Sequence, residues 1–368
     1  MVTTPLKDLL ARPTMRIALI YNEPKHTEPD DHWLSKSGTE LSQTFRDASE
    51  FGVLEEIEHI AAALREGNHT VTIFSVDDDV ERLVSFLEND RPEAIFNLCE
   101  SVLGRADLEM CIAGVFDLFG IPFTGAGTMG LGIALNKAIS KAIFVANHIP
   151  TPAFEAYEVG EMPSDDIRLN YPLIVKPLRE DASIGIDNNS IVNNFASLCE
   201  RVEFVHLEFK QPALVEEFID GRELNVAVIA TDDGSFKTLP ISEITFDALP
   251  PGNPRIVSYE AKWVEESPLY KTTVPKCPAV LDEEIAIRAR AIALKAANTV
   301  GLRDYGRIDM RLRDDGALFV LEANPNPDIS QDAGFMRACF TSGLTHSQAI
   351  NLIASQAGKR ILPPKNNL

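Results

Sequence analysis

The fold is decided by two short runs that flank a turn: Tyr305-Gly306-Arg307-Ile308-Asp309-Met310-Arg311, then Asp314-Asp315-Gly316, then Leu318-Phe319-Val320-Leu321-Glu322-Ala323-Asn324. Apolar residues alternate in both runs, and Asp-Gly is a strong hairpin signal. In the antiparallel pair that this pattern predicts, Asp309 lies beside Glu322, and Asn324 points the same way as Glu322. We therefore expect three oxygen-bearing side chains on one face of a hairpin.

These side chains favour a divalent metal next to an anion. Carboxylate and amide oxygens suit Mg²⁺, which often shares phosphate oxygens with its protein ligands. Arg307 precedes Asp309 by two residues, where a guanidinium can neutralise a transferring phosphoryl group. The alternative is an ordinary surface hairpin, but the charged Glu322 within an otherwise apolar run argues against it.

Composition bounds the class of protein. The chain has 368 residues and a formal net charge of −21, so nucleic acid and anionic membranes are not expected partners. The length allows two or three domains. Five scattered cysteines without a Cys-x-x-Cys pair predict reduced thiols in a cytoplasmic protein. We see neither a signal-peptide pattern nor an apolar run of membrane-spanning length, so we expect no membrane association.

The N-terminal part alternates between strand and helix patterns. Strands are predicted at 16–21, 70–75 and 94–98, with helices at 53–64 and 107–119. This order predicts an open α/β unit with a parallel sheet. Ligands of such units bind beyond the carboxyl ends of the strands. The positions that follow these strands, among them Asn97 and Glu100, are therefore expected near a site.

Gly125-Ala126-Gly127-Thr128-Met129-Gly130 matches a dinucleotide-binding fingerprint. Its context is poor, because the preceding apolar run 121–123 is very short and contains Pro122, and no acidic residue follows at the required distance. A hinge that leads into one helix at 133–146 is the favoured interpretation. An oxidoreductase that binds NAD remains the alternative.

Lys176 ends a predicted strand at 171–177 and precedes a loop of small polar residues. A lysine in this position can hold phosphates, and the sequence contains no Walker A motif. Glu216 and Glu223 flank an Asp-Gly turn, and a carboxylate there can accept hydrogen bonds from ribose hydroxyls. Lys262, in a predicted loop at 259–263, can reach a phosphate from a lid.

In this order, the motifs resemble an ATP-grasp ligase of the D-alanine–D-alanine ligase group from about residue 94 to 330. The segments that carry the resemblance are Thr124–Lys141, Ile174–Gly185, Leu214–Glu223, Tyr259–Lys262, Gly306–Asp309 and Leu321–Asn324. The resemblance implies α/β and α+β units in a three-domain ATP-grasp architecture with an N-terminal open parallel sheet. The implied domains are an N-terminal unit at 1–125, a central ATP-grasp subdomain at 126–217 and a C-terminal subdomain with the metal site at 218–368.

The resemblance also implies the roles of individual residues. Catalytic roles fall on Arg307, Lys262 and Ser183. ATP is held by a nucleotide set: Lys137, Lys176, Glu180, Ser183, Glu216, Glu217, Phe218, Glu223, Lys262, Leu321 and Glu322. Within it the three lysines contact phosphates, whereas Glu216 and Glu223 hold adenine and ribose. The metal is Mg²⁺, with Mn²⁺ as the other candidate, on Asp309, Glu322 and Asn324.

The implied reaction joins a carboxylate to an amine through an acyl phosphate, which forms a peptide bond and releases ADP. The partners are then small amino-acid or carboxylate substrates, and the resemblance is compatible with a homodimer. Two other readings stay open. One is an ATP-grasp enzyme with a different class of acceptor, and the other is a nucleotide-binding module without turnover.

Residues on the substrate side depart from the family pattern. Ala182 stands where the loop usually has a serine, Trp263 replaces a lid tyrosine, and Asp328 adds negative charge where a substrate carboxylate would sit. The family's N-terminal Ser-x-Glu has no clear counterpart, although Glu23 and Glu50 are candidates. We therefore expect substrates that need not be two D-alanines.

Overall fold

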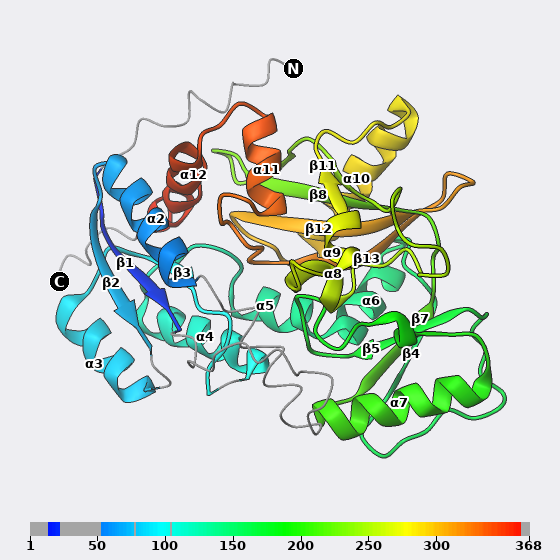
Figure 1. The fold of residues 1–368 in the computed structure, drawn as a ribbon. Coiled ribbons are helices and arrows are strands. Elements are labelled where there is room, and N and C mark those ends of the chain that lie inside the picture. The colour runs from blue at the N-terminus through cyan, green and yellow to red at the C-terminus, as the bar shows by residue number, and fades with distance from the viewer. Residues whose placement is uncertain (1–13, 23–52, 77–78, 104, 362–368) are drawn as a thin grey trace.

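The structure is a computed structural model, and it describes residues 14–22, 53–76, 79–103 and 105–361. Glu23 and Glu50 lie outside these residues. The chain forms three sheets, each covered by helices (Figure 1). This arrangement confirms the predicted mixture of a parallel α/β unit with antiparallel α+β units.

The N-terminal sheet is parallel, as the sequence predicts, and its strand order is β2-β1-β3. Its strands are β1 (Arg16–Tyr21), β2 (Thr70–Ser75) and β3 (Ala94–Leu98). Successive residues of a strand face opposite sides of a sheet. Ile17 and Leu19 accordingly pack into one hydrophobic core, whereas Ala18 and Ile20 pack into another.

Helices cover both faces of this sheet, as a parallel sheet requires. One face carries α2 (Val53–Glu66), and the other carries α3 (Val80–Asp90) and α4 (Glu109–Phe119). Polar residues at the carboxyl ends of β1 and β3, among them Asn22 and Glu100, line a pocket at one edge of the layer.

The central sheet is antiparallel, in the order β4-β7-β5-β6. Its strands are β4 (Phe154–Tyr157), β5 (Leu173–Pro177), β6 (Ile191–Val192) and β7 (Ala213–Glu217). The helix α7 (Phe195–Phe209) packs Leu198, Val202 and Val205 against it, which is the apolar spacing of a helix with one buried face. Lys176 lies in β5 and Glu216 in β7.

The C-terminal sheet contains the predicted hairpin and follows the order β11-β10-β8-β12-β13, with β9 beside β8. The strands are β8 (Arg222–Ala230), β9 (Phe236–Thr238), β10 (Ser242–Thr245), β11 (Val274–Lys276), β12 (Tyr305–Leu312) and β13 (Leu318–Asn324). The strands β9 and β10 are separate, because Pro240 between them has no N–H to donate to a ladder.

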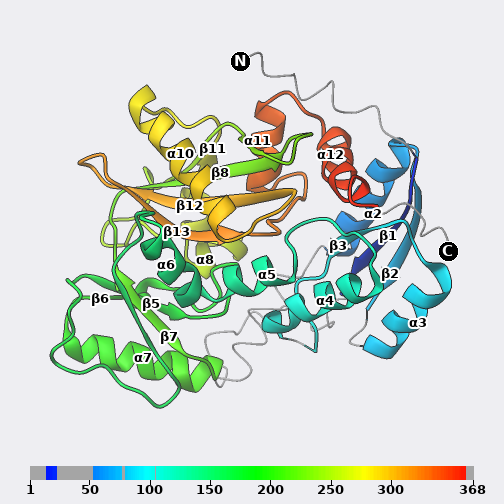
Figure 2. The same ribbon diagram turned by 180° about the vertical axis from the view of Figure 1, so that it is seen from behind.

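Helices of the C-terminal part pack on both faces of this sheet. They are α10 (Glu283–Thr299), α11 (Gly334–Thr341) and α12 (His346–Gly358). The last of these lies beside α2 in both views (Figures 1 and 2), and Asn351 donates a hydrogen bond of 2.7 Å to the Ala63 carbonyl. Residues from both ends of the chain thus share one core. We propose the division at residues 125 and 217 as the boundary of the three units.

The single helix expected at 133–146 is wrong. The chain forms α5 (Thr128–Leu135) and α6 (Lys137–Ala146), which are bent by 98°. Asn136 causes the break, because its side chain accepts a hydrogen bond of 3.1 Å from the Ile139 N–H and so begins a new helix. In the described chain no helix taken singly has the length and apolar character of a membrane span, although this bent pair reaches both when counted together.

Candidate active site

The hairpin of β12 and β13 gathers the predicted polar groups. Its turn contains Gly316 with a φ of 82°, a left-handed conformation that glycine adopts at little cost. Asp309 and Glu322 are cross-strand partners, and Arg307 stands opposite Asn324. The register shifts directly after Asp309, and such bulges redirect side chains near functional sites.

Asp309 accepts four hydrogen bonds. Arg307 donates Nε to Oδ1 and Nη2 to Oδ2, each at 2.7 Å. Asn225 donates to Oδ1 at 2.7 Å and Asn324 to Oδ2 at 2.9 Å. Asn225 is the β8 partner of Asp309 and was not predicted, although a lone asparagine in an apolar strand was the available signal. Because Asn324 uses its nitrogen here, its amide oxygen faces away from this bond and is suited to hold a cation.

Lys137 faces the hairpin from the first residue of α6. Its Nζ lies 3.7 Å from Glu322 Oε2 and 3.0 Å from Asp181 Oδ1, and it donates to the Glu180 carbonyl oxygen. Burial alone lowers the pKa of Lys137, but the charges of Asp181 and Glu322 outweigh burial and raise this pKa overall. The lysine therefore stays charged beside the Glu322 carboxylate.

Glu322 is surrounded by cations. Burial by itself raises its pKa, but the charges of Lys137, Lys176 and Arg307 lower the pKa overall. These cations come from three different elements, α6, β5 and β12. The site is therefore an ionised carboxylate inside a ring of positive charge, which can receive a metal and a polyanion together.

Glu216 is buried between two lysines. It is 1% exposed, and its carboxylate forms ion pairs of 2.6 Å with both Lys141 and Lys176. Burial raises the pKa of Glu216, but the two lysines lower it to about 2. Lys141 was not predicted as a site residue. Lys141 follows Lys137 by four residues on one helix, which places both side chains on the same side. This spacing was the available signal in the sequence.

Burial and a second lysine nearby both favour the neutral form of Lys141. The pKa of Lys141 is lowered to about 8, first by burial and then by the charge of Lys176, against the opposing effect of Glu216. When both lysines are protonated and Glu216 is ionised, the three side chains together carry a net charge of one positive unit. An anionic ligand is therefore electrostatically favoured at this position.

The loop 179–186 connects β5 to the rest of the central unit. Ala182 and Ser183 have φ values of 55° and 63°, which are unusual for residues with a side chain and mark strain at functional loops. Ser183 Oγ donates a hydrogen bond of 2.8 Å to the Val257 carbonyl. Glu180 is buried and accepts a hydrogen bond of 2.9 Å from Gln211 Nε2. Neighbouring segments thus hold the loop in one conformation.

The segment expected as a loop at 259–263 forms a short helix, α8 (Tyr259–Trp263). The expectation is wrong because Ser258 caps the helix by accepting a hydrogen bond of 3.2 Å from the Ala261 N–H. The substitution of Trp263 for a tyrosine does not break the contact with the loop. The indole Nε1 donates a hydrogen bond of 2.9 Å to the Ala182 carbonyl oxygen. This backbone acceptor takes the place of the serine hydroxyl that is absent at position 182.

Lys262, next to this contact, places its Nζ 4.9 Å from the ring centre of Trp263. Its pKa is lowered, first by burial and then by the charge of Arg307, whereas Asp328, Asp309 and Glu322 act in the opposite direction. The lysine therefore lies within electrostatic reach of Glu322, as Lys137 does. The helix α8 thus contributes a further cation near the hairpin.

Trp263→Phe is expected to loosen the loop without removing the apolar packing, because only the N–H is lost. One hydrogen bond to a half-buried carbonyl is worth about 1 kcal/mol, so amide hydrogen exchange in residues 181–186 should rise about fivefold. Exchange measured by mass spectrometry checks this. Tyr270→Phe, on the neighbouring helix α9 (Pro268–Thr272), is the control. Equal exchange in both variants would show that the indole bond does not hold the loop.

The remaining nucleotide set lies along β7, β8 and β13. Glu217 and Phe218 are half-buried at the end of β7, and Leu321 is half-buried beside Glu322. Glu223 is 9% exposed and lies 3.0 Å from Arg311 Nη2. Arg311 also lies 5.8 Å from the ring centre of Phe218. Sequence reasoning missed Arg311, although Arg307, Asp309 and Arg311 alternate along one strand.

The glycine motif at 125–130 serves packing. Gly125 has a φ of 83°, and a Cβ on it would lie 2.0 Å from Asn326 Oδ1. The following helix α5 begins at Thr128 with Gly127 as its N-cap. Glycine at 125 is therefore required by the approach of the segment after β13.

Known proteins share both sequence and fold with this chain. The model of the D-ala D-ala ligase C-terminus family matches residues 144–355. D-alanine–D-alanine ligase of Bordetella petrii is 30% identical over 265 residues, which cover 72% of this chain and 76% of that protein. The uncharacterized protein y4sG of Sinorhizobium fredii is 31% identical over 311 residues, covering 82% and 87%.

The chain belongs to the D-alanine–D-alanine ligase family of ATP-grasp proteins. It is therefore an ATP-dependent, ADP-forming ligase. The fold agrees with this membership. The crystal structure of D-alanine–D-alanine ligase from Bacillus anthracis complexed with ATP superposes with a TM-score of 0.70 at 20% identity, covering 94% of this ligase and 98% of that chain.

Proposed function

We propose that this ligase joins a substrate carboxylate to a substrate amine through an acyl phosphate. One observation carries the proposal: the Asp309–Glu322 pair lies among cations from α6, β5 and β12, of which Lys137 lies 3.7 Å from Glu322. Such a set neutralises two anions that must meet, the triphosphate and the attacking carboxylate.

The nucleotide set divides into three roles. Lys137, Lys176 and Lys262 contact phosphates, with Glu180 and Ser183 shaping the loop over them. Glu223, held by Arg311, accepts from the ribose, while Glu217, Phe218 and Leu321 border the base. We assign Glu216 a different task from the one its sequence position implies. Because its carboxylate pairs with Lys141 and Lys176 at 2.6 Å, it orients these lysines rather than the sugar.

Asp309, Glu322 and Asn324 fit Mg²⁺, with Mn²⁺ as the alternative. Two carboxylates on neighbouring strands and an amide oxygen not engaged with Asp309 make the oxygen-rich set that these ions prefer. When bound, the metal supplies positive charge to the phosphate oxygens. Arg307 is held by the two hydrogen bonds that it donates to Asp309, so its guanidinium is positioned before substrate arrives.

In the first half of the reaction a substrate carboxylate oxygen attacks the γ-phosphorus of ATP and ADP leaves. In the second half a deprotonated amine attacks the acyl carbon, the C–N bond forms and phosphate leaves. Water would destroy the acyl phosphate, so closure of α8 over the loop 179–186 matters for yield. The bond from Trp263 to the Ala182 carbonyl keeps these two segments together.

Phosphate and ADP release with ATP and Mg²⁺ across a panel of amino acids tests the proposal. We expect ADP release only when a carboxylate and an amine are both present. ATP binding without ADP release for any pair would identify a nucleotide-binding module, and hydroxyl or thiol acceptors that outperform amines would identify a different acceptor class. Efficient dipeptide formation from D-alanine alone would contradict the view that the substrates differ from two D-alanines.

The reaction is placed in the cytoplasm by this proposal. All five cysteines are free thiols in the structure, which fits a reducing compartment. The net charge of −21 disfavours nucleic acid and anionic membranes as partners. A homodimer remains part of the proposal, and light scattering of the purified enzyme tests it.

A further inference from the structure

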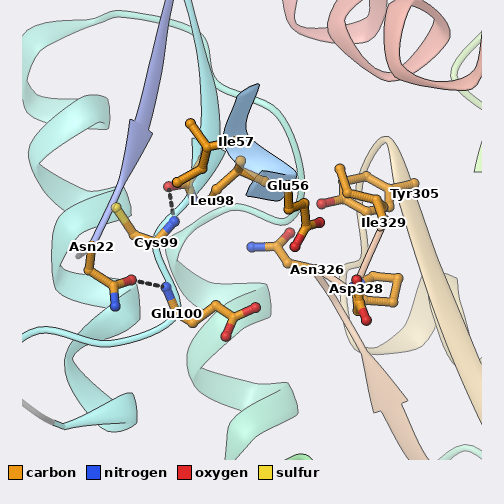
Figure 3. Close-up of a pocket in the computed structure, with 12 residues that line it drawn as sticks. Asn22, Glu56, Ile57, Leu98, Cys99, Glu100, Tyr305, Asn326, Asp328 and Ile329 are labelled. Atoms are coloured by element: carbon orange, nitrogen blue, oxygen red, sulfur yellow. Dashed lines mark hydrogen bonds between the residues drawn. The ribbon is translucent and has the colours of Figure 1, made fainter. Parts of the chain in front are cut away.

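A pocket lies where the N-terminal sheet meets the segment after the metal hairpin (Figure 3). It has about 540 Å³ of empty volume, including its open mouth. One wall is formed by Glu56 of α2 and by Asn97 and Glu100 at the end of β3, and the other by Tyr305 and Asp328. Asp328 follows the proposed metal ligand Asn324 by four residues, so the pocket adjoins the reaction site.

The pocket is acidic. Its described lining includes three carboxylates, Glu56, Glu100 and Asp328, and contains neither lysine nor arginine. The carboxylates of Glu56 and Asp328 face the same space (Figure 3). No group of three or more His, Cys, Asp or Glu side chains in the described chain is placed to hold a metal ion. The negative charge is therefore arranged for a larger organic cation.

Asn97 adds an independent sign of a ligand. Its side chain is 1% exposed and lines the pocket. The amide oxygen accepts a hydrogen bond of 3.2 Å from the Cys99 N–H, whereas the amide nitrogen has no partner among the residues that the structure describes. A buried donor without a partner is costly, and a ligand oxygen in the pocket can satisfy it.

Glu56 has no partner of opposite charge in the described part of the chain. Within the described chain no group donates a hydrogen bond to it or forms an ion pair with it. Its pKa is raised to about 8, first by burial and then by the charges of Asp328, Glu100 and Asp332. A cation bound beside this carboxyl group would stabilise its ionised form and so lower its pKa.

We propose that this pocket binds the amine substrate of the ligase, and that this amine carries a second cationic group. The inference rests on the proposed function and names its substrate class. One amine faces the acyl phosphate beside Asn324, and the second cation pairs with Glu56 and Asp328. The Asn97 donor favours a substrate that also has an acceptor oxygen, so a dibasic amino acid fits better than a simple diamine.

Binding can be measured without turnover. Isothermal titration with lysine, norleucine and 1,5-diaminopentane compares ligands of similar length, with both enantiomers of each amino acid. We expect lysine to bind at least about tenfold more tightly than norleucine, which lacks only the second ammonium. Lysine should also exceed 1,5-diaminopentane, which lacks the oxygen for Asn97. Equal affinity of lysine and norleucine would overturn the proposal, and equal affinity of lysine and the diamine would overturn the role of Asn97.

Ionisation of Glu56 provides a second readout. At pH 7 the binding of a dication should release a proton, because the cation lowers the raised pKa of this carboxyl. Titration in buffers of different ionisation enthalpy detects that proton. Glu56→Gln should abolish the release and weaken lysine binding about tenfold while leaving norleucine unchanged. Glu55→Gln, an exposed neighbour on α2, is the control and should behave as wild type.

The two proposals fail in different ways. ADP release with neutral amino acids but no preference for lysine would leave the ligase function standing and overturn the dicationic substrate. Lysine binding that depends on Glu56, without ADP release for any carboxylate, would keep the pocket assignment and overturn the ligase function.

Discussion

Glu322→Gln is expected to abolish ATP turnover, lowering the rate of ADP release by about 1,000-fold or more, while the fold stays intact. Glu322 is the cross-strand partner of Asp309 and is held ionised by Lys137, Lys176 and Arg307. The glutamine keeps the shape of the side chain but loses the negative charge that a metal needs. ADP release measured with a coupled assay checks the effect.

The hairpin offers a matched control for this variant. Asp315→Asn removes a carboxylate from the turn of the same hairpin, where Asp315 pairs with Arg313 at the surface, and should retain the wild-type rate. Circular dichroism and thermal unfolding of both variants report the fold. A Glu322→Gln enzyme with a near-normal rate would show that the metal and phosphates are bound elsewhere.

Glu216→Gln is expected to destabilise the ligand-free protein by about 3 kcal/mol, because it leaves two buried lysines without their counter-ion. Lys141 is fully buried and Lys176 is 5% exposed. The triphosphate of ATP can replace the lost negative charge, so the deficit should shrink when ATP and Mg²⁺ are added. Chemical unfolding with and without nucleotide measures both quantities.

The stabilising effect of Glu216 should depend on pH, which provides a second check on this prediction. The pKa of Glu216 falls from 4.5 to about 2 in the folded protein, so its stabilising effect is complete above pH 4.5 and is lost as the pH falls toward 2. The wild-type and Glu216→Gln curves should therefore converge in acid. Glu203→Gln, an exposed change on α7, is the control. An unchanged stability of Glu216→Gln would contradict the bridging role.

Much of the fold was predictable because local signals carry it. The hairpin pattern predicted β12, β13 and the Asp309–Glu322 pairing, and short apolar runs predicted the N-terminal strands. Predictions that needed exact breaks were wrong. The Asn136 side chain divides α5 from α6, and Ser258 turns the lid into α8, since a capping bond outweighs the surrounding periodicity.

The sequence indicated many residues of the candidate site, but it did not indicate which of them contact one another. Asn225 and Arg311 escaped the sequence reading, because they reach Asp309 and Glu223 through the register of β12 with β8 and through packing across the sheet. Glu216 was expected at the nucleotide base, but the arrangement of β5, β7 and α6 places it between two lysines. Neither contact leaves a local pattern.

The sequence by itself determined the strands, the turn chemistry and the order of charged motifs, since these depend on neighbours a few residues apart. Only the tertiary structure decided which charges meet. It brings Glu56 of α2 to Asp328 beyond β13 and joins Trp263 of the lid to the Ala182 carbonyl. The physical reason is that these encounters depend on how whole elements pack, and packing is settled by the core of the complete chain.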